Sequence, residues 1–143
     1  MTRYLLDTNV LSELPRPQPD PAVVRFIASI PERQLLISVL SLGEIRRGIE
    51  RLPVSRRRVQ FEAWFQHDLI ERFKDRLLGV DLGIAEAWGQ LSAVQLERGR
   101  TLPVVDGLLA ATALYHGLSL VTRNVRDFDG LGAPVVNPWK RLV

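Results

Sequence analysis

Short runs of apolar residues without polar alternation recur near both ends of the chain. They cover residues 3–6, 34–39, 118–122 and 134–136. Such runs are typical of strands that are buried on both faces of a sheet. The pattern therefore predicts four buried strands.

Between these runs the apolar residues recur with helical spacing. Asp20 and Pro21 suit the N-cap and first position of a helix, and Gly99 and Gly117 suit the position after a helix end. The predicted helices cover residues 21–30, 42–52, 55–77, 82–98 and 104–115. Strands alternate with helices at both ends of the chain, and the middle is helical. This order predicts an α/β fold, a three-layer α/β/α sandwich with a mostly parallel central sheet.

The longest predicted helix carries a stripe of large apolar side chains. Phe61, Phe65, Leu69 and Phe73 follow one another at intervals of four residues. Any helix that packs along one face shows this spacing. The stripe therefore indicates a core face or a partner-facing surface in preference to a platform for stacking bases.

Length and composition indicate a single folded domain over residues 1–143. The chain is 46% hydrophobic and 24% charged, as is usual for soluble proteins. It has no cysteine, which excludes disulfides, thiolate nucleophiles and cysteine-bound zinc. Asp7 interrupts the apolar run that a signal peptide would need, and no apolar stretch reaches the ~20 residues of a membrane span. A soluble, cytoplasmic protein without membrane association is expected.

The basic residues are almost all arginine. The formal net charge is only +3, but 17 of the 19 basic residues are arginine. Arginine binds planar anions such as phosphate through two parallel hydrogen bonds, which favours a polyanionic partner. An arginine-rich genome would produce the same surface, and charge alone does not decide between the two interpretations.

Asp7 directly follows the first predicted strand. In an open parallel sheet, ligands bind beyond the carboxyl ends of the strands, where the strand order reverses. An aspartate at this place can be the N-cap of the next helical turn or a functional carboxylate. Thr8 could cap the same turn without placing a charge at a buried strand end, so the functional interpretation is favoured.

Two further acids lie at starts of predicted helices. Glu44 is the last residue of a Ser-x-x-Glu sequence that begins at Ser41, and this sequence by itself fits a helix capping box. Glu44 is also a site candidate, because it follows the second predicted strand. Asp106 lies at the start of an otherwise apolar helix of small residues. A carboxylate in such surroundings must be hydrogen-bonded, paired or bound to metal, so a cap and a metal ligand are its two candidate roles.

A fourth candidate region follows the predicted strand at residues 118–122. Asn124 and Asp127 could each point into the same crevice, and the sequence does not choose between them. Asp129 belongs to an ordinary Asp-Gly turn and is left out.

Acids that converge on one crevice repel one another unless a cation neutralises them. Oxygen ligands without histidine or cysteine select Mg²⁺ or Mn²⁺ over zinc. Such an ion can activate water for attack on a phosphodiester, so phosphodiester hydrolysis is the chemistry that fits. The two histidines, His67 and His116, suit surface or helix-end positions better than catalytic ones.

Four segments of the chain together resemble the PIN domain. They are residues 5–9, 38–44, 103–113 and 120–124, the last followed by Asp127 and Phe128. The resemblance is closest to the VapC-like and FitB-like toxin ribonucleases of type II toxin–antitoxin systems, and it runs from near residue 3 to near residue 138. Each segment alone is a weak signal, whereas four in this order are specific.

The resemblance implies roles for the first three acids. Asp7 and Asp106 would be the principal Mg²⁺ ligands, and Glu44 would help to bind metal or to position water. Thr8 and Asn9 would support the first ligand.

The resemblance also bears on the fourth region. The family often has an acid two residues after the threonine that is Thr122 here, and this chain has Asn124 at that position. Asp127 is the alternative acid. Arg123 and Arg126 are candidate contacts to nucleic acid.

Three functional hypotheses follow. The resemblance implies a magnesium-dependent endoribonuclease toxin that cleaves RNA, often transfer RNA, forms homodimers and larger assemblies, and is held in check by a cognate antitoxin. Asn124 motivates the alternative of a weakly active or inactive PIN-like module that binds operator DNA only through its antitoxin. A phosphorylation-receiver domain shares the expected architecture, but it needs a lysine near the end of a late strand, and the only lysines are Lys74 and Lys140.

Overall fold

The computed structural model of the chain describes residues 1–140, and five strands form its central sheet. The strands are β1 (Tyr4–Leu6), β2 (Leu35–Ser38), β3 (Leu77–Leu78), β4 (Ser119–Val121) and β5 (Val135–Val136). Their order is β3-β2-β1-β4-β5, and every neighbouring pair is parallel, which confirms the predicted parallel sheet. Strands β2 and β3 lie on one side of β1, and the chain then crosses to form β4 and β5 on the other side. The strand order therefore reverses between β1 and β4, where ligand sites of open α/β sheets lie.

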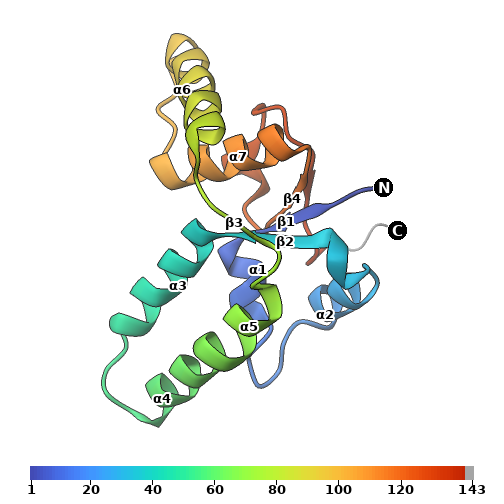
Figure 1. The fold of residues 1–143 in the computed structure, drawn as a ribbon, viewed down its shortest axis with the longest axis vertical. Helices are drawn as coiled ribbons and strands as arrows, with labels where there is room; N and C mark the ends of the chain where they lie inside the picture. Colours follow the sequence, from blue (N-terminus) through green and yellow to red (C-terminus); the bar gives the residue numbers. More distant parts are fainter. Residues whose placement is uncertain (141–143) are drawn as a thin grey trace.

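Helices cover both faces of the sheet, as the predicted three-layer sandwich requires (Figure 1). One face carries α1 (Thr8–Glu13), α2 (Pro21–Ala28), α3 (Val39–Glu50), α4 (Arg56–Ala63), the π-helical η2 (Trp64–Leu69) and α5 (Ile70–Phe73). The opposite face carries α7 (Val104–His116), with α6 (Leu82–Glu97) packed on it and extending away from the sheet. Two 3₁₀ turns, η1 (Glu32–Gln34) and η3 (Val125–Phe128), precede β2 and follow β4.

Neighbouring residues of the central strands belong to two different cores. Leu5 and Leu120 pack beneath α7, whereas the residues that follow them, Leu6 and Val121, pack against the helices of the other face. Successive side chains of a strand point to opposite faces, so a strand covered on both sides must be apolar at every position. This is why the predicted strands appear as unbroken apolar runs.

The segment predicted as one helix over residues 55–77 differs from the structure in two ways. Its helical part ends at Phe73 and includes the π-helical segment η2. Leu77, placed at the helix end by the sequence, instead begins β3 and lies opposite Ile37 of β2. A two-residue edge strand is too short to show a pattern, so four strands were predicted and five are present.

The aromatic stripe of this segment is a core face. Phe65, Leu69 and Phe73 are buried, with 6% or less of each exposed, and Phe61 is half-buried beside them. Among the described residues, no helix is long and apolar enough to span a membrane.

The start of α3 corrects the predicted capping box. The helix begins at Val39, three residues earlier than predicted, and the side chain of Ser38 accepts a hydrogen bond from the Leu40 N–H (3.0 Å). Glu44 therefore lies in the second turn and caps nothing. The hydroxyl of Ser41 is buried and, within residues 1–140, has no hydrogen-bond partner. The sequence pattern does not predict Ser38 as the cap, because Ser38 is also the last residue of β2.

Replacing the true cap should destabilise the protein more than replacing the residue that sequence pattern alone favours. We expect Ser38→Ala to lower the free energy of unfolding by about 1 kcal/mol, because the Leu40 N–H loses its acceptor. Ser41→Ala removes a hydroxyl without a partner and should change stability by less than about 0.5 kcal/mol. Urea unfolding of the two variants measures the difference, and a larger loss in Ser41→Ala would contradict the assignment.

Candidate active site

Asp7 lies at the carboxyl end of β1, where the strand order reverses. Its backbone N–H donates to the carbonyl of Val121 on β4 (2.9 Å), and Oδ1 accepts from the Thr8 N–H (2.7 Å) as the N-cap of α1. Its other oxygen, Oδ2, accepts from the hydroxyl of Thr122 (2.8 Å). Only 7% of Asp7 is exposed. The carboxylate is thus a cap and also lies at the carboxyl edge of the sheet, so the two candidate roles do not exclude each other.

Thr122 orients this carboxylate from β4. Its side chain is fully buried, and its Oγ1 accepts from Asn9 Nδ2 (3.3 Å) and from the Asn124 N–H (3.1 Å) while it donates to Asp7. Asn9 also accepts from the backbone N–H of Arg123 (3.3 Å). The two strand ends are therefore joined by side chains as well as by backbone.

Glu44 reaches the end of β1 from α3. Its Oε1 accepts from the hydroxyl of Thr8 (2.7 Å), so the residue after Asp7 connects two acids that are far apart in sequence. Thr8 is used twice, through its N–H to Asp7 and through its hydroxyl to Glu44. This contact places Glu44 beside the end of β1, although in sequence it follows the second strand.

Asp106 and Asp127 complete the group of acids. Asp106 is in the first turn of α7, and Asp127 is in η3. The guanidinium of Arg100 donates to the carbonyls of Asp127 and Asp129 (both 2.9 Å), which ties η3 to the loop before α7. Arg100 was not predicted as a site residue, because its two acceptors are backbone carbonyls that only the folded chain brings near it.

The charges of the neighbouring acids act on Asp7 and Asp106. Burial is the main cause that raises the pKa of Asp7; Glu44 and Asp127 raise it further, while the hydrogen bonds from Thr122 and Thr8 oppose the rise. Burial also raises the pKa of Asp106, followed by the charges of Asp127, Asp7 and Glu44, and the charge of Arg100 opposes this. Asp127 is therefore the acid of the fourth region whose charge reaches Asp7 and Asp106.

The donor chemistry fits a hard divalent cation. The side chains that converge are carboxylates and hydroxyls, and their mutual repulsion leaves negative charge that a cation would neutralise. Within residues 1–140, no three Asp, Glu or His side chains are close enough to hold one ion together. Mg²⁺ is commonly held by one or two carboxylates with water completing its shell, so it does not require a cluster of three protein ligands.

The other residues considered from the sequence, which are those after β4 and the two histidines, lie at or near the protein surface. Asn124 contributes its backbone N–H to Thr122 and is exposed. The guanidinium of Arg123 lies over the ring of Trp139, 5.1 Å from its centroid, and Arg126 is exposed. His67 is exposed on η2, and His116 is the last residue of α7, as their predicted surface and helix-end positions require.

The chain is similar to known proteins in both sequence and structure. The family model described as "PIN domain" matches residues 4–133. The chain is similar to a VapC ribonuclease of Sinorhizobium fredii (32% identity; 95% of this chain and 97% of the relative). It is also similar to toxin FitB of Neisseria gonorrhoeae (31%; 94% and 97%). A solved structure of FitAB bound to a DNA fragment superposes with a TM-score of 0.91 at 29% identity and covers 98% of both chains.

Removing one of the crowded charges should stabilise the metal-free protein. The folded-state pKa of Asp106 lies above its ordinary value of 3.8, so folded protein binds a proton more tightly than unfolded protein does, and stability falls as the pH rises through this window. In EDTA at pH 7, Asp106→Asn should therefore raise Tm by about 1–3 °C, and by less at pH 4. Asp129→Asn, in the nearby turn, is the control for loss of a charge. A lower Tm for Asp106→Asn at pH 7 would count against the repulsion.

Proposed function

The chain belongs to the PIN-domain family, in its VapC-like and FitB-like branch, and from this premise we propose that it is a magnesium-dependent endoribonuclease, the toxin of a toxin–antitoxin pair. The observation that carries the proposal is the group of four acids, Asp7, Glu44, Asp106 and Asp127, beside the point where the strand order reverses. Two of its members are buried enough for their pKa values to rise. Such a concentration of charge lowers stability and is typical of catalytic sites.

In this proposal each side chain has a task that its contacts support. Asp7 and Asp106 hold Mg²⁺, with Asp7 kept in one orientation by Thr122 and by the Thr8 N–H. Glu44, fixed by the Thr8 hydroxyl, orients water. When bound, Mg²⁺ supplies the positive charge that activates water and stabilises the charge on the departing oxygen of the RNA. Arg100 keeps Asp127 at the crevice by holding η3.

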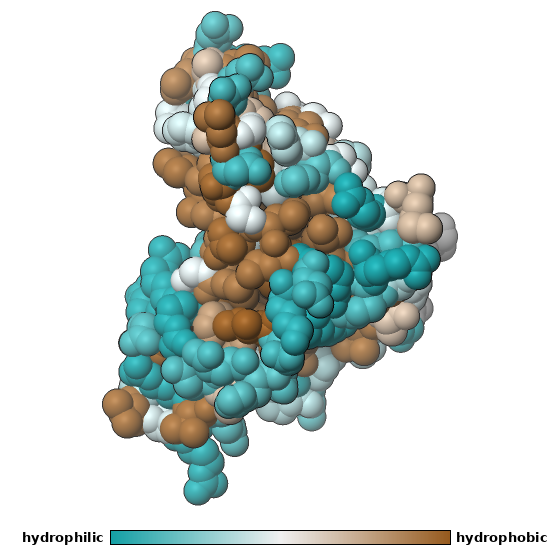
Figure 2. Space-filling view, in the orientation of Figure 1, coloured by the Kyte–Doolittle hydropathy of each residue, from teal (hydrophilic) through white to brown (hydrophobic). Residues whose placement is uncertain are grey.

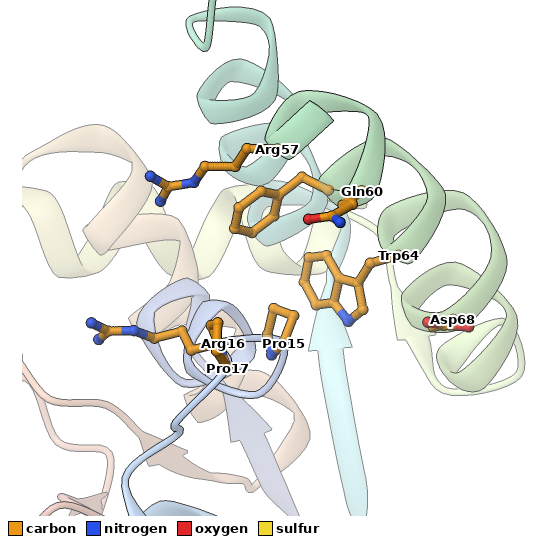
Figure 3. Close-up of a pocket in the computed structure, with 8 residues that line it drawn as sticks. Pro15, Arg16, Pro17, Arg57, Gln60, Trp64 and Asp68 are labelled. Carbon is orange, nitrogen blue, oxygen red and sulfur yellow. The ribbon is translucent and has the colours of Figure 1, made fainter. Parts of the chain in front are cut away.

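We further propose that the antitoxin binds a groove beside α4. The groove, of about 770 Å³, lies between the turn after α1 and the first turns of α4 and η2 (Figure 3). The rings of Phe61 and Trp64 and the prolines Pro15 and Pro17 line it, with Arg16 and Arg57 at its rim. Aromatic and proline side chains around an open groove suit the apolar side of a peptide segment. An antitoxin segment is the occupant in this proposal.

The homodimer that the resemblance implies has a candidate surface on α6 and α7. Of the α6 side chains only Ile84 and Gln95 are buried. Val94, Leu114 and Tyr115 line one shallow depression and are 42%, 40% and 55% exposed. Figure 2 shows further apolar side chains in the hollow between the part with α6 and α7 and the helices of the other face. Contiguous exposed apolar surface commonly marks an association site, so this face is proposed for a second copy.

A second candidate function is a weakly active PIN-like module that acts with its antitoxin on operator DNA. Asn124, in place of an acid, favours it, because an amide oxygen brings no charge to the fourth position. The absence of a three-ligand cluster within residues 1–140 also favours weak metal binding. Titration with Mn²⁺ separates the candidates, since no binding near millimolar concentration would support the second.

The purified protein should cleave RNA in Mg²⁺ and stop when EDTA is added. Asp7→Asn and Asp106→Asn should each lower the cleavage rate by about 100-fold or more, because each removes a charged ligand of the proposed metal. Asp129→Asn is the matched control, since this acid lies in the turn after η3, and its rate should stay within about twofold. Cleavage of a labelled single-stranded RNA and of bulk transfer RNA measures the effect.

Two results would contradict the proposed nuclease. One is cleavage that persists unchanged in both Asp7→Asn and Asp106→Asn, which would indicate a contaminating enzyme. The other is protein that binds Mn²⁺ and is free of antitoxin but cuts neither RNA.

The groove can be tested with two matched glutamine substitutions. Gln60 lines the groove and Gln66 lines a different depression, and both are exposed. Gln60→Arg should weaken binding of the antitoxin encoded by the neighbouring reading frame by at least about tenfold, because the longer side chain fills the groove. Gln66→Arg should leave the affinity unchanged. Calorimetric titration measures both, and equal affinities would place the antitoxin elsewhere.

A further inference from the structure

Helix α3 contains two glycines that its own packing does not require. Gly43 and Gly48 lie inside the helix, are exposed and have ordinary negative φ angles. A Cβ added at either position would meet no atom within 4 Å. Glycine inside a helix lowers stability relative to alanine, so each residue weakens α3 without any steric need in the described structure.

The two glycines lie on different flanks of the helix. Residues four apart share a face, so Gly48 lies one turn beyond Glu44, whose carboxylate is in the candidate active site. Gly43 is five residues before Gly48, and at about 100° per residue the two are about 140° apart around the axis. Ile45 and Ile49 mark the buried side, and Glu44 lies on the exposed arc between the two glycines. Around the axis Glu44 is about 40° from Gly48 and about 100° from Gly43, so Gly48 is the glycine on the side of Glu44.

Two arginines continue the same exposed side of α3. Arg47 and Arg51, three and seven residues after Glu44, are exposed and have no carboxylate partner within residues 1–140. Arg46 differs from them, because it forms ion pairs with Glu50 (3.2 Å) and Glu62 (2.8 Å). Arg46 thus joins α3 to α4, whereas Arg47 and the C-cap residue Arg51 remain available to bind an anion.

We propose that Gly48, Arg47 and Arg51, here called the α3 track, hold the RNA backbone beside the phosphodiester that is cut. Arg47 and Arg51 would bind phosphate oxygens, which the planar guanidinium does through paired hydrogen bonds. Gly48 would be the point of closest approach, where the missing side chain lets the sugar-phosphate backbone lie against the helix. The track rests on the proposed nuclease function and extends it to how the substrate is held.

Matched glycine substitutions test the α3 track. Gly89, inside α6, is exposed and likewise has no atom within 4 Å of an added Cβ, so it is the control. Gly89→Ala and Gly48→Ala should both raise Tm by about 2–4 °C, because alanine favours the helix and neither Cβ meets an atom. Only Gly48→Ala should lower kcat/KM for RNA cleavage, by at least about fivefold, while Gly89→Ala stays within about twofold of the unsubstituted protein. Equal cleavage by the two variants would overturn the track. So would a lower Tm for Gly48→Ala, since the fold itself would then need the glycine.

The arginines are tested by the salt dependence of RNA binding. In the Asp106→Asn background, which should not cut RNA, Arg47→Gln and Arg51→Gln should each reduce the slope of log K against log salt by about 0.7. Arg33→Gln, at an exposed arginine of η1, should leave the slope unchanged and is the control. Unaltered slopes for Arg47→Gln and Arg51→Gln would overturn the track.

Failure of the track and failure of the nuclease give different results. If the unsubstituted protein does not cut RNA, the proposed function fails, and the binding slopes still decide whether the track holds RNA. If the unsubstituted protein cuts RNA and the Gly48 and Gly89 variants are equal, only the track fails. If Gly48→Ala cuts RNA normally but loses affinity for the antitoxin, this face belongs to the protein partner and the track is overturned.

Discussion

The rest of the structure depends on a carboxylate buried at the end of the central strand. A buried charge must be hydrogen-bonded, and Asp7 meets this need with the Thr8 N–H of α1 and the Thr122 hydroxyl of β4. Thr8 extends the connection to Glu44 on α3. One carboxylate thus fixes how two strands and two helices meet at the point where the strand order reverses. These hydrogen bonds compensate for the solvation that Asp7 loses on burial. They also hold its carboxylate in a single orientation, which a metal ligand or a base that activates water requires.

Much of this arrangement was predictable, because the fold places its acids by a simple rule. Strands buried on both faces leave unbroken apolar runs, and an acid directly after such a run must lie at the carboxyl edge of the sheet. Asp7 follows this rule. The features that were missed depend on contacts between distant segments. The two residues of β3 pair with β2, the cap of α3 is a strand residue, and Arg100 holds η3 through backbone carbonyls. A local pattern cannot record such pairings, and it could not choose between Asn124 and Asp127.

The arginine content has two causes that composition could not separate. Arg72 and Arg76 clamp Glu32, the first through Nε and Nη2 (2.7 and 2.8 Å), and lower the pKa of that carboxyl to about 2. Arg58, within the basic run at residues 56–58, is likewise bound to Glu50 and to the carbonyl of Leu52. These side chains hold secondary structure together and are not free to bind nucleic acid. Whether an arginine has a carboxylate partner therefore indicates its role better than whether it lies in a basic stretch of the sequence.

Stability and function oppose each other at the carboxyl edge of this sheet. Neighbouring acids raise the pKa values of Asp7 and Asp106, so the folded state carries repulsion that the unfolded chain avoids. A divalent cation that binds only the folded state would remove this repulsion and add its own binding free energy to stability. An occupied site would therefore be more stable than an empty one. The sheet and its two cores supply the stability that allows such a site to exist, which is why the acids lie at the sheet's edge and the core contains none of them.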